Sequence, residues 1–142
     1  MPRAFPLAGL LRVRGLAEDQ AAGALAAAHR EENAARERAV ETARMLGEVG
    51  AVAPADAAAF RASIAARMAL SGLLTEAKEQ VVVAHGHTMD RTHDWSEARK
   101  ATRSVERLAE HHDEQVRAED AQAEQKVLDE VGSRRPTRAG VP

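Results

Sequence analysis

Six histidines are the residues of this chain best suited to chemistry, and five of them fall within a short part of the sequence. His85, His87 and His93 lie close together, and His111 and His112 are adjacent. Imidazole nitrogens are common zinc ligands, so a metal site is the first chemistry to consider. On a helix, residues two apart point to nearly opposite faces, and His85 and His87 share one ion only if the helix unwinds locally. We therefore expect solvated or seam-edge histidines, no bound metal and no cofactor, with zinc binding as an alternative.

Catalytic motifs are missing from the sequence. It contains no HExxH pair, no glycine-rich phosphate loop and no GxSxG nucleophile elbow. It contains no cysteine, which excludes a disulfide framework and thiol chemistry. The many carboxylates are typical of a solvated helix face. The sequence therefore predicts a protein that is not an enzyme.

The elements that would position these side chains are long helices. Alanine, the best helix former, accounts for 32 of the 142 residues, and Pro54 is the single proline between Leu7 and Arg135. Only three aromatic residues are present, so the core must be thin and lined by alanine. This composition predicts an all-α fold, an elongated antiparallel two-helix coiled-coil hairpin.

The boundaries follow from stop and start signals. We expect a first helix over about residues 7–49, a turn over 50–56 and a second helix over about 57–131. Gly47 and Gly50 supply the stop signals, and Asp56 is the candidate N-cap of the second helix.

Together these elements form one domain, residues 1–132, followed by a disordered basic tail over 133–142. The second helix is the longer one, so its C-terminal part is expected to overhang the first helix unless the second helix bends. Gly72 and Gly86 are the places where it could bend at least cost. Whether residues 57–72 continue that helix or fold back is left open by the sequence.

A seam of alternating three- and four-residue steps runs along the first helix. Its expected members are Leu7, Leu10, Arg14, Ala17, Ala21, Ala24, Ala28, Glu31, Ala35, Arg38, Thr42, Met45 and Val49. In the second helix, the expected apolar series is Phe60, Ile64, Met68, Leu70, Leu74, Ala77, Val81, Ala84, Trp95, Ala98, Val105, Leu108, Val116, Ala123, Val127 and Val131.

Charge and hydropathy restrict the partners. The net charge is −2, and basic and acidic residues are balanced in both end regions, so a nucleic-acid partner is not expected. No apolar run is judged long enough to span a membrane, and the N-terminal residues lack a signal-peptide core. We expect a cytoplasmic protein.

Two apolar features have alternative interpretations. Trp95 either fills a gap in the seam or anchors a partner. Phe60, Ile64 and Met68 follow one another at four-residue spacing near the turn, so they either pack on their own hairpin or form a docking ridge.

The two ends of the chain resemble the flagellar export protein FliJ family. At the start, residues 5–14 (Phe-Pro-Leu-Ala-Gly-Leu-Leu-Arg-Val-Arg) followed by Glu18, Gln20 and Ala21 are similar to the family's opening. Near the end, Arg99-Lys100-Ala101, Val105-Glu106-Arg107-Leu108 and Glu124-Gln125-Lys126-Val127-Leu128-Asp129-Glu130-Val131 resemble its closing helix. The length and the hairpin plan agree with the resemblance, and residues 30–98 match only in being helical.

The resemblance implies a non-enzymatic component of the flagellar type III export apparatus, shaped like a rotary-ATPase stalk. Its expected partners are the export ATPase ring, the export gate protein and substrate chaperones, with peripheral association at the cytoplasmic face of the cell membrane. Four basic residues lie in the segments expected at the ring: Arg12, Arg14, Lys126 and Arg134. A generic coiled-coil scaffold with no ATPase partner is the competing interpretation.

Overall fold

The computed structural model describes residues 3–134, and they form two long helices. Helix α1 spans Ala8–Ala51 and helix α2 spans Ala57–Ser133, so the second helix is the longer by far. α1 and α2 pack against each other, which confirms the predicted all-α helical hairpin. The predicted basic tail falls almost wholly on residues 135–142, outside the described residues, and its first residue, Ser133, belongs to α2.

The helix ends are fixed by specific hydrogen bonds. The N–H of Ala59 donates to Oδ1 of Asp56 at 2.7 Å, which confirms Asp56 as the N-cap of α2. At the end of α1, the guanidinium of Arg67 donates to the carbonyl oxygen of Gly50 at 3.3 Å, satisfying one of the acceptors that a helix C-terminus leaves open. Gly47 does not stop α1, because the helix continues to Ala51.

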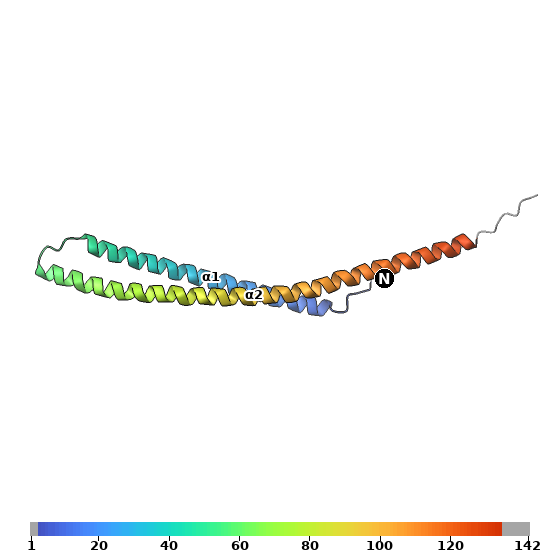
Figure 1. Ribbon diagram of the computed structural model, residues 1–142, viewed down its shortest axis with the longest axis horizontal. Helices are drawn as coiled ribbons and strands as arrows, with labels where there is room; N and C mark the ends of the chain where they lie inside the picture. Colours follow the sequence, from blue (N-terminus) through green and yellow to red (C-terminus); the bar gives the residue numbers. More distant parts are fainter. Residues whose placement is uncertain (1–2, 135–142) are drawn as a thin grey trace, which may run out of the picture. The chain divides into compact units, whose positions relative to one another are not determined.

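Contacts divide the chain into two compact units, each containing part of both helices. The first unit consists of Met1–Leu16 and Lys100–Pro142, and the second is the continuous segment Ala17–Arg99. In the second unit, α1 and α2 run antiparallel, side by side, and the short connection at residues 52–56 joins them at one end (Figure 1). α2 passes through Gly72 and Gly86 without a break, so residues 57–72 continue the helix.

The core is thin, as the composition predicts. The apolar residues that are buried are three alanines and one valine: Ala28, Ala35, Ala77 and Val105. Three polar residues are buried with them: Glu32, Thr88 and Thr102. Small side chains allow the two helix backbones to approach closely, but they remove little apolar area from water.

The expected seam of α1 is half right. The side chains that face α2 are half-buried or buried at Leu11, Gly15, Glu18, Ala21, Leu25, Ala28, Glu32, Ala35, Ala39, Thr42, Leu46 and Val49. Every seventh position from Ala21 to Val49 agrees with the prediction, and the intervening position is one residue later than expected. Leu25 replaces Ala24, and Glu32 replaces Glu31. The steps along a seam can alternate as three then four residues or as four then three, and the two patterns differ only in these intervening residues. The structure has the pattern that places Leu25 and Leu46 inside.

Candidate functional site: partner-binding surfaces

The first candidate surface, the terminal surface, lies in the unit that contains both chain ends. Arg12 and Arg14 of α1 are exposed, and so are Lys126 and Arg134 of α2. None of the four makes an ion pair within residues 3–134. The main-chain carbonyl of Arg14 accepts a hydrogen bond from the hydroxyl of buried Thr102 at 3.2 Å, and this bond fixes the two helices to each other at that level.

An N-terminal arm packs along α2 in the same unit, and no pattern in the sequence predicts it. Arg3 forms an ion pair with Glu119. The rings of Phe5 and His112 lie with their centroids 5.6 Å apart and their planes tilted by 58°. Nδ1 of His112 is enclosed without a hydrogen-bond partner in the described part of the chain. The arm therefore contacts α2 at His112 and at Glu119, and the Glu119 side chain stays exposed.

Beyond the arm, α2 has no helix beside it. Every described residue from 117 to 134 is exposed. The exposed apolar side chains of this bare stretch include Val127, Leu128 and Val131. Ala123, Glu124, Val127 and Leu128 line a shallow, almost wholly apolar surface hollow of about 450 Å³. Ala123, Val127 and Val131 belong to the expected apolar series of this helix. They are exposed because they lie in the part of α2 that extends past α1, as the lengths of the two helices predict.

Glu32 is the centre of a polar cluster between the helices of the second unit. Its Oε1 lies 3.0 Å from Nδ1 of His85, and Arg36, one turn along α1, also donates to this oxygen. The hydroxyl of Thr88 lies against the same carboxylate and is 3.2 Å from the carbonyl oxygen of Ala84. The hydrogen bond with Thr88, followed by those with Arg36 and His85, lowers the pKa of Glu32 to about 2, against the opposing effect of burial.

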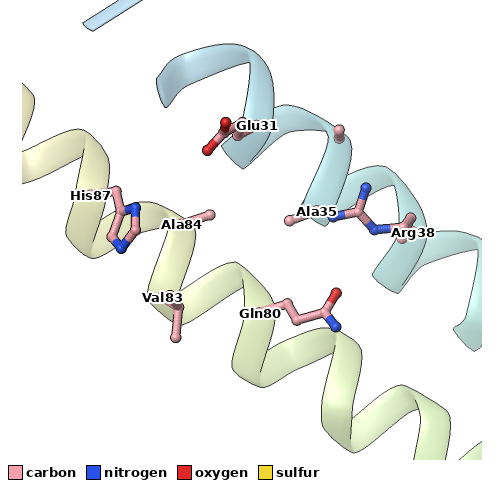
Figure 2. Close-up of a pocket in the computed structure, with 8 residues that line it drawn as sticks. Glu31, Ala35, Arg38, Gln80, Val83, Ala84 and His87 are labelled. Carbon is pink, nitrogen blue, oxygen red and sulfur yellow. The ribbon is translucent and has the colours of Figure 1, made fainter. Parts of the chain in front are cut away.

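A small hollow of about 290 Å³ lies between α1 and α2 near this cluster (Figure 2). It is lined by Glu31, Ala34, Ala35 and Arg38 of α1 and by Gln80, Val83, Ala84 and His87 of α2. In Figure 2, Ala84 of α2 and Ala35 of α1 point toward one another, whereas Val83 points away from α1. The described lining contains no serine, threonine, cysteine or lysine that could act as a nucleophile beside a base.

The histidines do not converge on a metal site. Within residues 3–134 there is no group of three or more histidine, aspartate or glutamate side chains placed to hold an ion. His85 contacts Glu32, His112 contacts Phe5, and His87 lines the hollow of Figure 2. The sequence placed these residues at the seam edge without indicating their partners.

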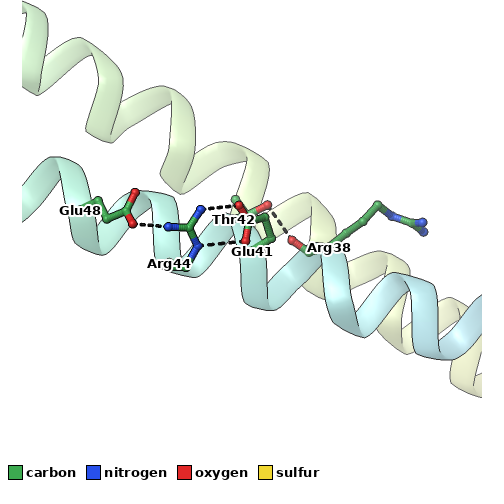
Figure 3. Close-up of polar contacts among 5 residues, drawn as sticks. All are labelled: Arg38, Glu41, Thr42, Arg44 and Glu48. Atoms are coloured by element: carbon green, nitrogen blue, oxygen red, sulfur yellow. Dashed lines mark hydrogen bonds and ion pairs between the residues drawn. The ribbon is translucent and has the colours of Figure 1, made fainter.

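The outer face of α1 near the turn is charged. Arg44 donates to both carboxylate oxygens of Glu41, with distances of 3.0 and 2.6 Å, and forms a second ion pair with Glu48 (Figure 3). The hydrogen bond from Arg44 lowers the pKa of Glu41. In the turn before Glu41 and Arg44, the hydroxyl of Thr42 donates to the carbonyl oxygen of Arg38 at 2.8 Å.

The outer face of α2 at the same end is apolar. Phe60 is 53% exposed, Ile64 42% and Met68 72%, so these residues do not pack on their own hairpin. α2 also contains an 18-residue window of mean hydropathy 1.2, none of it buried, which meets the requirement for a membrane span by length and composition only. The expectation that no such segment exists is therefore wrong. Trp95, in contrast, is half-buried on the seam side of α2.

The chain was compared with known families, curated proteins and solved structures. A family model described as flagellar FliJ protein matches residues 3–140, which is nearly the whole chain. No curated protein and no solved structure matches the chain.

Proposed function

The chain belongs to the flagellar FliJ protein family and is thereby a non-enzymatic component of flagellar export, and we propose that it acts as a stalk-like adaptor for the export ATPase. The adaptor engages the ATPase ring through the terminal surface and links the ring to the export gate and to substrate chaperones. It works in the cytoplasm, at the inner face of the cell membrane.

The bare stretch of α2 is the observation that supports this role best. Past the end of the paired helices, every residue of α2 from 117 to 134 is exposed, and an apolar row continues along this stretch. An exposed apolar row of this kind is suited to binding a partner. Its flanks are acidic, since residues 119–130 contain five carboxylates and one lysine. The neighbouring segment 3–14 has three arginines and no carboxylate. A ring pore with apolar groups facing the exposed row, basic groups facing residues 119–130 and acidic groups facing residues 3–14 would be complementary to these two segments.

The adaptor needs no chemistry of its own. A helical pair inside a ring can bind one conformation of a ring subunit more tightly than another. The difference between these two affinities shifts the subunit toward the conformation that is bound more tightly. Shape and a few charged contacts supply that difference. Exposed charges are screened beyond about 8 Å at physiological ionic strength, so the association should weaken as salt is added.

Charge reversal at Arg12 and Arg14 tests the proposal. The variant R12E/R14E should stay helical by circular dichroism. It should require about tenfold more protein for half-maximal stimulation of the export ATPase, because two exposed ion pairs are worth about 0.2–1 kcal/mol each. The matched control is R30E/R38E, which reverses two exposed arginines on the same helix in the other unit and should stimulate as the wild type does.

The competing scaffold role makes the opposite prediction. If wild type and R12E/R14E, both folded, have the same effect on the ATPase or none, the terminal surface has no part in the mechanism. The chain is then a coiled-coil scaffold or spacer.

A further inference from the structure

The first turns of α2, residues 57–74, are apolar on both sides of the helix. The side toward α1 has half-buried residues at Ala59, Ser63, Ala66, Leu70 and Leu74. The opposite side has the exposed row Phe60, Ile64 and Met68. A helix that is hydrophobic all round is normally enclosed by protein or by lipid, yet here one side is open. We call the exposed side of residues 57–74 the tip face.

The tip face is a property of α2 alone. At the same end of the second unit, the outer face of α1 has the ion-pair network of Arg44 with Glu41 and Glu48 (Figure 3). The turn continues the apolar surface, with Val52 70% exposed. Val52, Ala53, Pro54 and Ala55, together with parts of both helix ends, line a shallow hollow of about 530 Å³.

Charge is scarce in this region, and most of it is already used. Between Val49 and Leu74 the charged residues are Asp56, Arg61 and Arg67. Asp56 caps α2, and Arg67 donates to the carbonyl of Gly50. Arg61 is exposed and makes no ion pair within residues 3–134. It lies three residues before Ile64 and seven before Met68, so it shares their face of the helix. The tip face is therefore an apolar row with one available positive charge.

We propose that the tip face binds the surface of a lipid bilayer that contains anionic headgroups. Phe60, Ile64 and Met68 enter the boundary between headgroups and acyl chains. The aliphatic part of Arg61 lies along the apolar row, and its guanidinium reaches lipid phosphates. This site is separate from the terminal surface and goes beyond the adaptor role proposed above.

Hydropathy and charge together favour lipid as the occupant. The window of mean hydropathy 1.2 lies at residues 57–74, is not buried, and meets the requirement for a membrane span by length and composition only. Its inner side packs on α1 and it contains two arginines, so the segment lies in the interface and does not cross. The net charge of +1 between Val49 and Leu74 is complementary to anionic lipid.

Vesicle flotation with the full-length chain tests the proposal. Wild type should float with vesicles of phosphatidylglycerol and phosphatidylethanolamine at millimolar lipid, and less with phosphatidylcholine alone. The variant F60Q/I64Q/M68Q should bind the anionic vesicles at least about tenfold more weakly, because three inserted apolar side chains are lost. R61Q should weaken binding to anionic vesicles and leave binding to phosphatidylcholine unchanged.

The matched control is V40Q/V82Q/M89Q, which replaces three apolar residues of the same unit that are 70%, 72% and 58% exposed. It should float as the wild type does, and all variants should have equal helicity by circular dichroism. Stimulation of the ATPase by F60Q/I64Q/M68Q should be unchanged, so failure of the lipid site is distinguishable from failure of the adaptor role.

Two results would overturn the lipid site. In the first, wild type stays out of the floating fraction at millimolar lipid, or F60Q/I64Q/M68Q floats as well as wild type. In the second, wild type ignores vesicles while the same variant loses binding to the cytoplasmic part of the export gate, which would assign the tip face to a protein.

Discussion

Glu32 is the residue whose environment departs most from what its type suggests. Glutamate is rarely buried, and here the carboxylate is only 6% exposed between two helices. It is tolerated because Thr88, Arg36 and His85 hydrogen-bond to the charged form. Through His85 and Thr88 of α2, the carboxylate of this α1 residue links the two helices, which gives Glu32 a part in fixing how α1 and α2 align.

The lowered pKa of Glu32 predicts an acid dependence of stability. The folded value is about 2 and the ordinary value is 4.5, so the unfolded chain takes up the proton first as the pH falls. The stabilisation by Glu32 is therefore present above about 4.5 and is lost as the pH falls toward 2. The melting temperature of wild type, followed by circular dichroism, should fall more over this range than that of Glu32→Gln.

An exposed glutamate of the same helix provides the comparison. Glu37→Gln should keep the wild-type pH dependence, since its side chain lies in solvent. If Glu32→Gln and wild type lose stability in parallel from pH 4.5 to 2, the cluster does not act through the carboxylate charge.

At the scale of the helix, mutations can test the register of the seam, that is, which residues of α1 face α2. Ala28 is 6% exposed and Ala24 is exposed, although both are alanines on α1 four residues apart. Ala28→Asp should therefore lower the stability by about 2–4 kcal/mol, because an unpaired charge enters the seam. Ala24→Asp should cost less than about 1 kcal/mol, mostly from helix propensity. Urea unfolding monitored by circular dichroism measures both, and equal losses would show that the register is wrong.

The sequence predicts the helices better than it predicts their contacts. The single interior proline and the abundant alanine determine two helices with ends near Ala51 and Ala57, and Asp56 has no better role than a cap. The order of the three- and four-residue steps is not determined, because similar residues occur at both choices, as Glu31 and Glu32 do, and Met45 and Leu46. The lengths of the helices predict that the end of α2 extends past α1, but periodicity does not show that the row of Phe60, Ile64 and Met68 stays exposed near the turn.

The candidate surfaces were only partly predictable for the same reason. Arg12, Arg14, Lys126 and Arg134 are exposed, as charged residues usually are, and their contacts with a ring stay a prediction. The N-terminal arm depends on Phe5 reaching His112, more than a hundred residues away, and local pattern has no means to show it.

For the whole molecule, the thin core predicts low stability without a partner. No side chain of the described residues is fully buried, and the buried apolar residues are alanines and one valine. Little apolar area therefore offsets the entropy of ordering the chain. The purified protein should melt at a low temperature over a broad range. Adding the export ATPase should raise the melting temperature, since a ligand at a hundred times its Kd stabilises by about 2.7 kcal/mol.

Scanning fluorimetry on the single tryptophan, with bovine serum albumin in place of the ATPase as control, measures this shift. A sharp transition at high temperature that the ATPase does not move would contradict it.

The bare stretch of α2 has one more consequence, which concerns the statistics of helix formation. Starting a helix is unfavourable, by a factor of about a thousand, because several residues must be fixed before the first hydrogen bond rewards them, whereas each later residue costs little. Residues 117–134 avoid the starting cost, since they extend a helix that is already formed against α1. Alanine, glutamine, glutamate and lysine, which propagate helix well, supply much of this stretch. The end of α2 can therefore unwind and re-form one turn at a time in the free protein. When a partner closes around it, the free-energy cost of ordering this end is that of helix elongation alone, without nucleation.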